Sequence, residues 1–160
     1  MAANIHLKID DLKGESKDKG FEGQIDVLSW SWSMTQTGTR HHGGGGGTGK
    51  VSVQDMTITK RLDKSSPELM LKCCNGKHYD KAELTVSKAG EDKLDYYKIT
   101  MHNVLISSVQ TGGSPGDEVV LENLSMNFEK FDIEYKEQDD KGKGKAPVKT
   151  GWDIAANTKK

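Results

Sequence analysis

The stretch QIDVLSWSWSMTQT, residues 24–37, alternates apolar and polar residues as a β-strand does, but the alternation changes side partway along. Before the change the apolar residues are Ile25 and Val27. After it they are Leu28, Trp30, Trp32 and Met34. Because successive side chains of a strand point to opposite faces, we expect a β-bulge or a barrel corner between Val27 and Leu28.

The same change of parity occurs in two other stretches. In residues 51–58 the apolar positions are Val51 and Val53, followed by Met56 and Ile58. In residues 124–135 they are Leu124, Met126 and Phe128, followed by Phe131, Ile133 and Tyr135. Such strands are longer than the usual ~5–6 residues and bend, which favours a strongly curved sheet or a closed barrel over a flat sandwich.

Strand patterns dominate the rest of the chain as well. Further strands are predicted at residues 5–9, 82–86, 97–109 and 149–154, and all apparent connections are turns of the antiparallel type. The predicted fold class is therefore all-β, a small β-barrel with one short helix.

That helix is predicted in KSSPELMLKCCNGKH, residues 64–78. Ser66 is the expected N-cap, Pro67 the first helical residue, and Gly76 the left-handed residue after the last turn. The residues expected to share one face are Leu69, Met70, Cys73 and Cys74. We expect this helix to cover an open end or edge of the barrel.

Length and charge limit the classes of function. A chain of 160 residues is expected to form one domain, residues 1–160, and its net charge of -1 gives no field that would attract nucleic acid or acidic lipid. Apolar runs never exceed three residues, so no membrane-spanning segment is expected. The N-terminus lacks the apolar region of a secretory signal, which predicts synthesis in the cytosol without general export. Adjacent Cys73 and Cys74 do not suit a disulfide.

A glycine-rich segment matches part of a phosphate-binding motif. From Gly44 the string GGGGTGK fits G-x-x-x-x-G-K, but Val51 stands where a magnesium-binding Ser or Thr is needed. A predicted strand follows instead of a helix, so no helix N-terminus would meet a phosphate. Residues 37–50 are therefore predicted to be a flexible loop between strands, and the Lys- and Gly-rich residues 137–149 a solvated linker.

No other motif indicates catalysis, a cofactor or a metal. Residues 112–116 match the G-x-S-x-G nucleophile elbow, but Pro115 follows Ser114 and has no N–H for an oxyanion hole. The five histidines, His6, His41, His42, His78 and His102, lack the spacing of metal ligands. Acid pairs such as Asp10 and Asp11 lie in predicted turns. We expect no catalytic, cofactor-binding or metal-binding residues.

The tryptophan strand has two unlike faces. Trp30 and Trp32 point to one side and are expected to be buried. The other side presents only Ser29, Ser31 and Ser33. This small polar side faces either bulk water, as in an ordinary monomer, or a channel.

Several stretches, in order and spanning nearly the whole chain, resemble the haemolysin-coregulated protein (Hcp) family of bacterial type VI secretion. They are KGESKDKG, IDVLSWSWS, GGGGGTGKVSVQDMTITKRLDKSSPELMLKCCNGKHY, ISSVQTGGSPGDE, ENLSMNFEKFDIEY and GWDI. The resemblance implies a small β-barrel similar to phage tail-tube proteins that assembles as hexameric rings. It also implies that the rings stack into a tube, exported by the machine that contains it.

The resemblance further implies roles for two parts of the chain. The glycine-rich segment resembles the loop with which one ring contacts the next, and its residues are Thr39, Arg40, His41, His42, Gly43, Gly44, Gly45, Gly46, Gly47 and Thr48. Ser31 is the candidate for the inner wall of the ring, in contact with effectors. The implied partners are further copies of the chain, the sheath, spike and baseplate proteins, and small effector proteins. Nucleic acid and membrane insertion are not expected.

Two other hypotheses remain from the residues alone. The chain could be a monomeric β-barrel module that binds a small ligand in its mouth, or a hydrolase that uses Ser114. Particle shape and mass would separate a ring from a monomer, and the Ser114→Ala substitution would abolish only a hydrolase activity. We expect a structural subunit that is not an enzyme and is secreted by the type VI machine.

Overall fold

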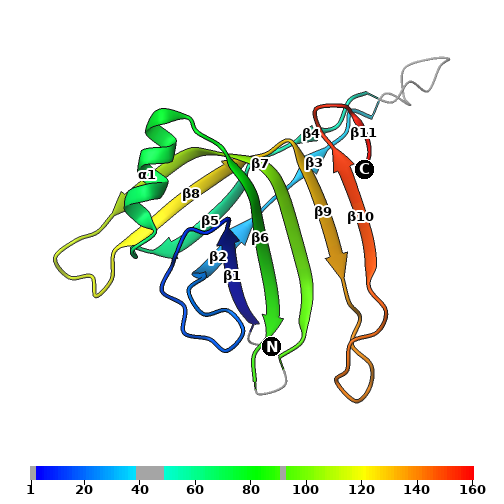
Figure 1. The fold of residues 1–160 in the computed structure, drawn as a ribbon, viewed down its shortest axis with the longest axis horizontal. Coiled ribbons are helices and arrows are strands. Elements are labelled where there is room, and N and C mark those ends of the chain that lie inside the picture. Colours follow the sequence, from blue (N-terminus) through cyan, green and yellow to red (C-terminus); the bar gives the residue numbers. More distant parts are fainter. Residues whose placement is uncertain (1–2, 39–48, 91–92) are drawn as a thin grey trace.

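Six antiparallel strands close into a barrel in the computed structural model, which describes residues 3–38, 49–90 and 93–160. Around the barrel they follow the order β7, β6, β1, β2, β5 and β8, and β8 pairs with β7 to close it (Figure 1). Their bounds are β1 Ala3–Ile9, β2 Ile25–Ser31, β5 Met56–Arg61, β6 Tyr79–Lys88, β7 Asp95–Gly112 and β8 Leu121–Asn127. The predicted all-β barrel with antiparallel connections is confirmed.

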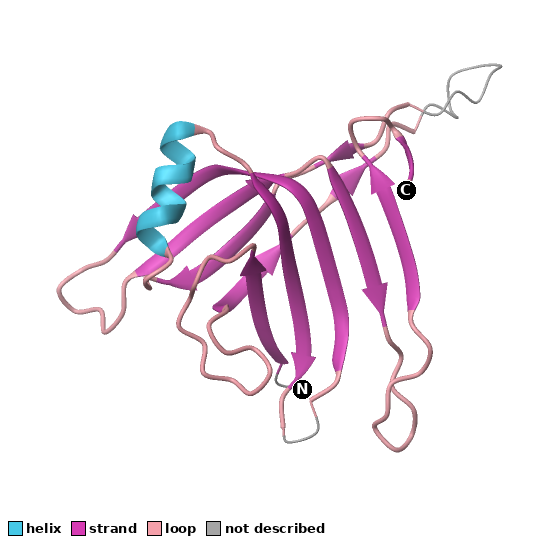
Figure 2. Ribbon diagram, viewed as in Figure 1, coloured by secondary structure: helices cyan, strands magenta, loops and turns pink. Residues whose placement is uncertain are grey.

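The sheet continues beyond the barrel on one side. Strands β9 (Lys130–Tyr135), β10 (Val148–Asp153) and β11 (Thr158–Lys159) extend it from the first half of β7. A separate two-stranded ribbon, β3 (Met34–Thr35) and β4 (Ser52–Val53), follows β2. Figure 2 shows that β9 and β10 stand as a hairpin at the edge of the molecule away from the helix. Strand β10 was predicted at residues 149–154, and β9 as the second part of residues 124–135. The two-residue strands β3, β4 and β11 were not predicted individually, because so short a strand carries too little periodicity.

Strand β7 supports both the barrel and the extension because it is long and bent. Its residues 97–102 pair with β9, and its residues 105–112 pair with β8. Between them Asn103 adopts φ 55°, a left-handed conformation that Asn tolerates better than most residues. The side chain of Asn103 donates to Glu129, at 2.8 Å, where the chain passes from β8 to β9. The predicted break between Phe128 and Phe131 is thus the point at which the chain leaves the barrel.

The predicted bulge in β2 is confirmed. The register between β2 and β5 shifts between Val27 and Ser29, which leaves Leu28 as the extra residue. Trp30 and Trp32 are half-buried and pack on the core as expected. The expectation that Leu28 and Met34 share their buried side was wrong, because both are exposed: Leu28 bulges out, and Met34 lies beyond the end of β2.

The barrel interior is filled by aliphatic side chains and methionines from every barrel strand. The fully buried members are Leu7, Ile9, Ile25, Met56, Ile58, Leu69, Ala82, Leu84, Ile99, Met101, Val104 and Met126. Burial of each large side chain contributes roughly 1.5–3 kcal/mol, so this one core is the main stabilising element.

The one helix among the described residues, α1, spans Ser66–Asn75 and places Leu69 in the core against β7. It ends at Gly76 with φ 68°, as predicted. The predicted N-cap was wrong by one residue, because Ser65 occupies that position. The hydroxyl of Ser66 is instead engaged by the N–H of Asp63 and the ammonium of Lys60. Cys73 and Cys74 are both free thiols, and Cys74 is exposed.

The two segments predicted to be flexible or linking are described to different extents. Most of the 37–50 loop, residues 39–48, lies outside the described residues. Residues 137–149 connect β9 to β10 as a hairpin, in which the N–H of Lys145 donates to the carbonyl of Glu137 at 2.7 Å. Within the described residues, no helix has the length and apolar character needed to cross a bilayer.

Candidate functional site, a neutral polar sheet face

On the outer face of β2, β5, β8 and the second half of β7, two neighbouring rows across the strands carry only uncharged polar side chains, and the next outward position of β5 is Arg61. One row runs Ser31, Thr57, Ser125, Ser108. The other runs Ser29, Thr59, Asn123, Gln110. We call these eight residues the hydroxyl face. Each is exposed or half-buried, whereas the alternate residues of the same strands are directed to the core.

Hydrogen bonds hold these side chains in place. Thr59 donates to Asn123 at 2.7 Å, and the hydroxyls of Ser108 and Ser125 lie 2.6 Å apart. At the end of the rows Asp55 accepts from Ser107 at 2.6 Å and from Asn127 at 2.9 Å. The carboxylate nearest the hydroxyl face is therefore already engaged by its neighbours, and the face presents short, neutral groups.

The opposite outer face of the barrel has a different character. Across β1, β6, β7 and β9 one row runs Lys8, Glu83, Thr100, Asp132. The next row includes Lys98 and Glu134, which face each other between β7 and β9. None of the eight residues of the hydroxyl face is charged, whereas Lys8, Glu83, Lys98, Asp132 and Glu134 carry charge on this second side. We call this second side the charged face.

Ser31 lies at the edge of the hydroxyl face beside a polar groove. The groove has a volume of about 650 Å³ and is lined by Ser31, Trp32, Ser33, Ser52, Val53, Gln54, Asp55 and Thr57. Its wall is held by the indole Nε1 of Trp32, which donates to the carbonyl of Gln54 at 3.0 Å. Ser31 is exposed, as the alternation of the strand predicts.

The two motifs rejected from the sequence lie beside strands in the part of the chain that the structure describes. Strand β4 follows Lys50, so no helix N-terminus is available for phosphate. Ser114 lies in the connection between β7 and β8, where its backbone N–H donates to Asp117 at 2.9 Å. A strand follows it rather than the helix of a nucleophile elbow. The candidate residues 39–48 for ring stacking lie outside the described residues.

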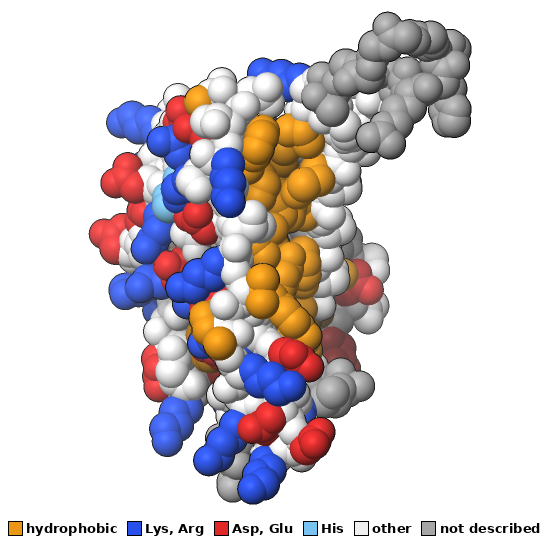
Figure 3. Space-filling model, turned by 90° about the vertical axis from the view of Figure 1, so that its right-hand side faces the viewer, with side chains coloured by type: hydrophobic (Ala, Val, Ile, Leu, Met, Phe, Trp, Pro, Cys, Tyr) orange, Lys and Arg blue, Asp and Glu red, His pale blue; other side chains and the backbone are white. Residues whose placement is uncertain are grey.

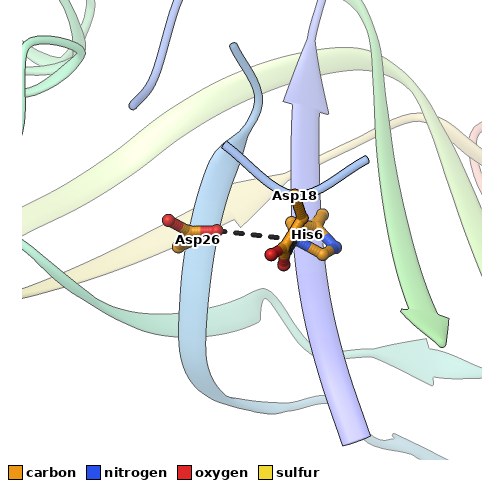
Figure 4. A group of neighbouring side chains, drawn as sticks. All are labelled: His6, Asp18 and Asp26. Atoms are coloured by element: carbon orange, nitrogen blue, oxygen red, sulfur yellow. Dashed lines mark hydrogen bonds and ion pairs between the residues drawn. The ribbon is translucent and has the colours of Figure 1, made fainter. Parts of the chain in front are cut away.

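One histidine joins two carboxylates from separate segments (Figure 4). The Nε2 atom of His6 lies 2.8 Å from Asp18 and 3.5 Å from Asp26, and its ring stacks on Phe21 at a centroid distance of 4.2 Å. Carboxylates only accept, so Nε2 carries the hydrogen. A metal at Nε2 would move that hydrogen to Nδ1, which is buried without a partner among the described residues. The group is therefore better suited to fix the 10–24 loop on β1 than to bind a metal.

A second polar cluster holds the C-terminal residue on the charged face. Partial burial acts to raise the pKa of Asp132, but hydrogen bonds from Lys160 and His102 outweigh it and leave the pKa below its usual value. His102 Nε2 lies 2.8 Å from this carboxylate. Because the folded pKa is lowered, the cluster stabilises the fold above the usual carboxylate pKa of about 4 and loses this effect as the pH falls through the folded value.

This cluster leads to a prediction for stability against pH. Asp132→Asn is expected to lower the free energy of unfolding at neutral pH by less than about 1 kcal/mol, since the groups are partly exposed. The difference from the wild type should shrink as the pH falls below about 4. Urea unfolding at a series of pH values measures it. Asp140→Asn, an exposed carboxylate outside the cluster, serves as control, and an equal pH dependence in both variants would contradict the assignment.

Sequence reasoning missed most of the hydroxyl face. Only the serines of β2 were singled out, whereas Thr57, Thr59, Asn123 and Ser125 belong to the same surface. The available signal was the alternation of small polar residues in MTITKR and LENLSMN. Their alignment with Ser29 and Ser31 depends on the strand register, which the alternation within one strand does not reveal.

The fold and this surface define a class: small closed β-barrel proteins whose two outer sheet faces differ in charge. A family model described as "Type VI secretion system effector, Hcp" matches residues 6–135. Protein hcp1 of Pseudomonas aeruginosa is 55% identical over 159 residues, which covers 98% of each chain. The chain belongs to the Hcp family of the type VI secretion system.

Solved structures agree with this assignment. A structure described as a type six secretion system protein superposes with a TM-score of 0.94 at 28% identity, covering 99% of this chain and 100% of that one. Hcp1 from Salmonella typhimurium gives a TM-score of 0.82 at 34% identity, covering 99% of both chains. The family is a structural, secreted component of type VI secretion, and the chain is a protein of that system.

Proposed function

We propose that this chain is the subunit of the type VI inner tube, in which six copies close into a ring and rings stack. The observation that carries the proposal, beyond membership of the family, is the separation of the hydroxyl face from the charged face on opposite sides of one barrel. In a ring every copy turns the same face to the centre, so one kind of surface lines the lumen and the other meets the surroundings.

We place the hydroxyl face toward the lumen. A lumen lined by like charges would focus an electrostatic field along the tube and select cargo by net charge. Short neutral hydroxyls produce no such field and leave the largest free diameter. Small effector proteins of either charge could then occupy the lumen. The charged face would meet the sheath, and the spike and baseplate proteins would contact the ends of the tube.

Residues 39–48 are proposed to contact the next ring. The described residues on either side of this segment lie close together, since a Cβ on Gly49 would collide with the hydroxyl of Thr37. The segment therefore leaves and rejoins the β3–β4 ribbon at one place. Ordering a loop costs roughly 1–2 kcal/mol per residue, so single contacts between rings should be weak and the tube should depend on many of them.

Purified protein tests the assembly directly. Light scattering should give a mass of about 106 kDa, six copies of the 17.6 kDa chain, and electron microscopy should show rings. A single mass of 17.6 kDa at every concentration tested would favour the alternative, a monomeric β-barrel module that binds a small ligand. Export is tested separately, by the appearance of the chain in the medium only when the secretion machine is active.

Ser31→Gln is expected to leave the ring intact and to reduce the proteins retained in its lumen at least tenfold, because six longer side chains would project into one channel. Tagged rings purified from the producing bacterium, with bound proteins measured by mass spectrometry, give the readout. Thr100→Gln introduces the same side chain on the charged face and should retain cargo as the wild type does. Equal cargo retention in both variants would contradict the placement of Ser31 in the lumen.

A further inference from the structure

Two separate apolar surfaces remain uncovered in the isolated chain. The first is a groove of about 650 Å³ between the β3–β4 ribbon and the β9–β10 hairpin. Its apolar lining residues are Met34, Val51, Val53, Phe131, Ile133 and Trp152. The same face of the hairpin continues to the cross-strand pair Tyr135 and Val148, and Val148 is 70% exposed. We call this surface the apolar groove, and hydrophobic side chains form a band along this side of the molecule (Figure 3).

The second surface lies where β5 ends and β8 begins. Four exposed apolar residues gather there: Leu62, Val119, Val120 and Leu121. They are held together because the N–H of Leu62 donates to the carbonyl of Val120 at 2.9 Å, and Arg61 pairs with Leu121. We call this set the apolar ridge. It adjoins the β7–β8 connection, which protrudes at the end of the molecule opposite the β9–β10 hairpin (Figure 1).

We propose that the apolar ridge of one copy seats in the apolar groove of the next, as the contact that closes the ring; this inference rests on the proposed ring. A ring of identical subunits needs two different, complementary surfaces on each copy rather than one that pairs with itself. The groove is concave, the ridge adjoins a protruding connection, and the two lie at opposite ends of the molecule. Both carry large exposed apolar side chains, which soluble monomers seldom gather in patches.

Charge favours the same pairing. Asp117 and Glu118 directly precede the ridge. A pocket that shares Ile133, Thr150 and Gly151 with the groove is lined by four lysines, Lys98, Lys149, Lys159 and Lys160, and by two carboxylates, Asp132 and Glu134. Because the lysines outnumber the carboxylates, the acidic residues beside the ridge would meet a surface of net positive charge.

The test uses two variants, one with an altered ridge and one with an altered groove. Val119→Glu/Val120→Glu adds negative charge to the ridge, and Tyr135→Glu/Val148→Glu adds negative charge to the groove, so the two altered surfaces repel each other in the mixture. Each variant alone is expected to sediment as a monomer, because every contact needs one ridge and one groove. Mixed in equal amounts they should form a dimer of about 35 kDa, two copies of the 17.6 kDa chain, since one intact ridge and one intact groove remain.

Several outcomes would overturn the inference. A ring formed by either variant alone, or a mixture that stays monomeric, would mean that ridge and groove do not meet. Leu71→Arg, exposed on α1 outside both surfaces, should still form rings. Because all four substituted residues are exposed, the far-UV circular dichroism spectra of the variants should match the wild type. If Tyr135→Glu/Val148→Glu fails to fold, Val148→Glu alone replaces it. A wild type that forms no ring would instead refute the proposed function.

Discussion

Replacing Lys60 by methionine is expected to lower the free energy of unfolding by about 3–5 kcal/mol, the typical effect of removing one partner from a buried ion pair. Lys60 is fully buried, and its ammonium donates to Asp63 and Ser66, both at 3.0 Å, and to the carbonyl of Arg61 at 3.1 Å. It also lies 3.5 Å from Glu122, which is its cross-strand partner and fully buried as well.

The physical reason is the carboxylate that would remain. At 3.5 Å the ammonium of Lys60 pairs with Glu122 by charge, while both carboxylate oxygens lack a hydrogen-bond partner among the described residues. Without Lys60 this buried group has no ion-pair partner among the residues that the structure describes, and burying a lone carboxylate is costly. The pair joins β5 to β8 and contacts the start of α1, so its loss affects three elements at once.

Two further variants make this prediction specific. Lys60→Met/Glu122→Leu removes both charges and should recover most of the lost stability, since apolar replacements of a buried pair are often neutral or better. Lys81→Met breaks an exposed pair with Glu83 at 3.1 Å and should cost less than about 1 kcal/mol. Urea unfolding at neutral pH measures all three. A Lys60→Met variant as stable as Lys81→Met would contradict the account.

Trp32→Ala is expected to destabilise the chain by about 3–5 kcal/mol and to prevent ring formation. The indole packs edge-on against Phe131 at a centroid distance of 4.8 Å and against Phe128 at 5.8 Å. It therefore joins the end of β2 to the start of the β9–β10 extension. Without this indole, the β3–β4 ribbon and the β9–β10 hairpin, which form the two walls of the apolar groove, are no longer packed on one shared side chain.

The conservative variant separates packing from hydrogen bonding. Trp32→Phe keeps an aromatic ring against Phe131 and loses only the bond from Nε1 to the carbonyl of Gln54, which contributes about 1 kcal/mol. It should still assemble. Unfolding measurements and light scattering on both variants check this, and a Trp32→Ala protein that forms normal rings would show that the groove does not depend on this indole.

Much of the fold was predictable because barrel strands alternate between core and surface. The bulge at Leu28, the break between Phe128 and Phe131, and the end of α1 at Gly76 each left a local signal in the sequence. The errors were also local. The N-cap is Ser65 rather than Ser66, because the ammonium of Lys60 hydrogen-bonds to the hydroxyl of Ser66. The capping preference of a residue type does not reveal that another side chain binds its hydroxyl.

The candidate site was predictable only in its first strand. Ser31 was found because its own strand alternates, while its row partners Thr57, Ser125 and Ser108 come from three other segments. Those partners depend on two register shifts, one in β2 and one in β7. A slip of one residue at either would have turned the same side chains to the other face.

By itself the sequence determined the class of structure and the family, because strand alternation, a capped helix and a series of family stretches are all encoded along the chain. The tertiary structure decided which residues act together: the hydroxyl face, the Lys60–Glu122 pair, and the groove and ridge at opposite ends. The physical reason is that each of these sets joins distant segments through cross-strand register. Closure of the barrel sets that register, and no single segment carries it.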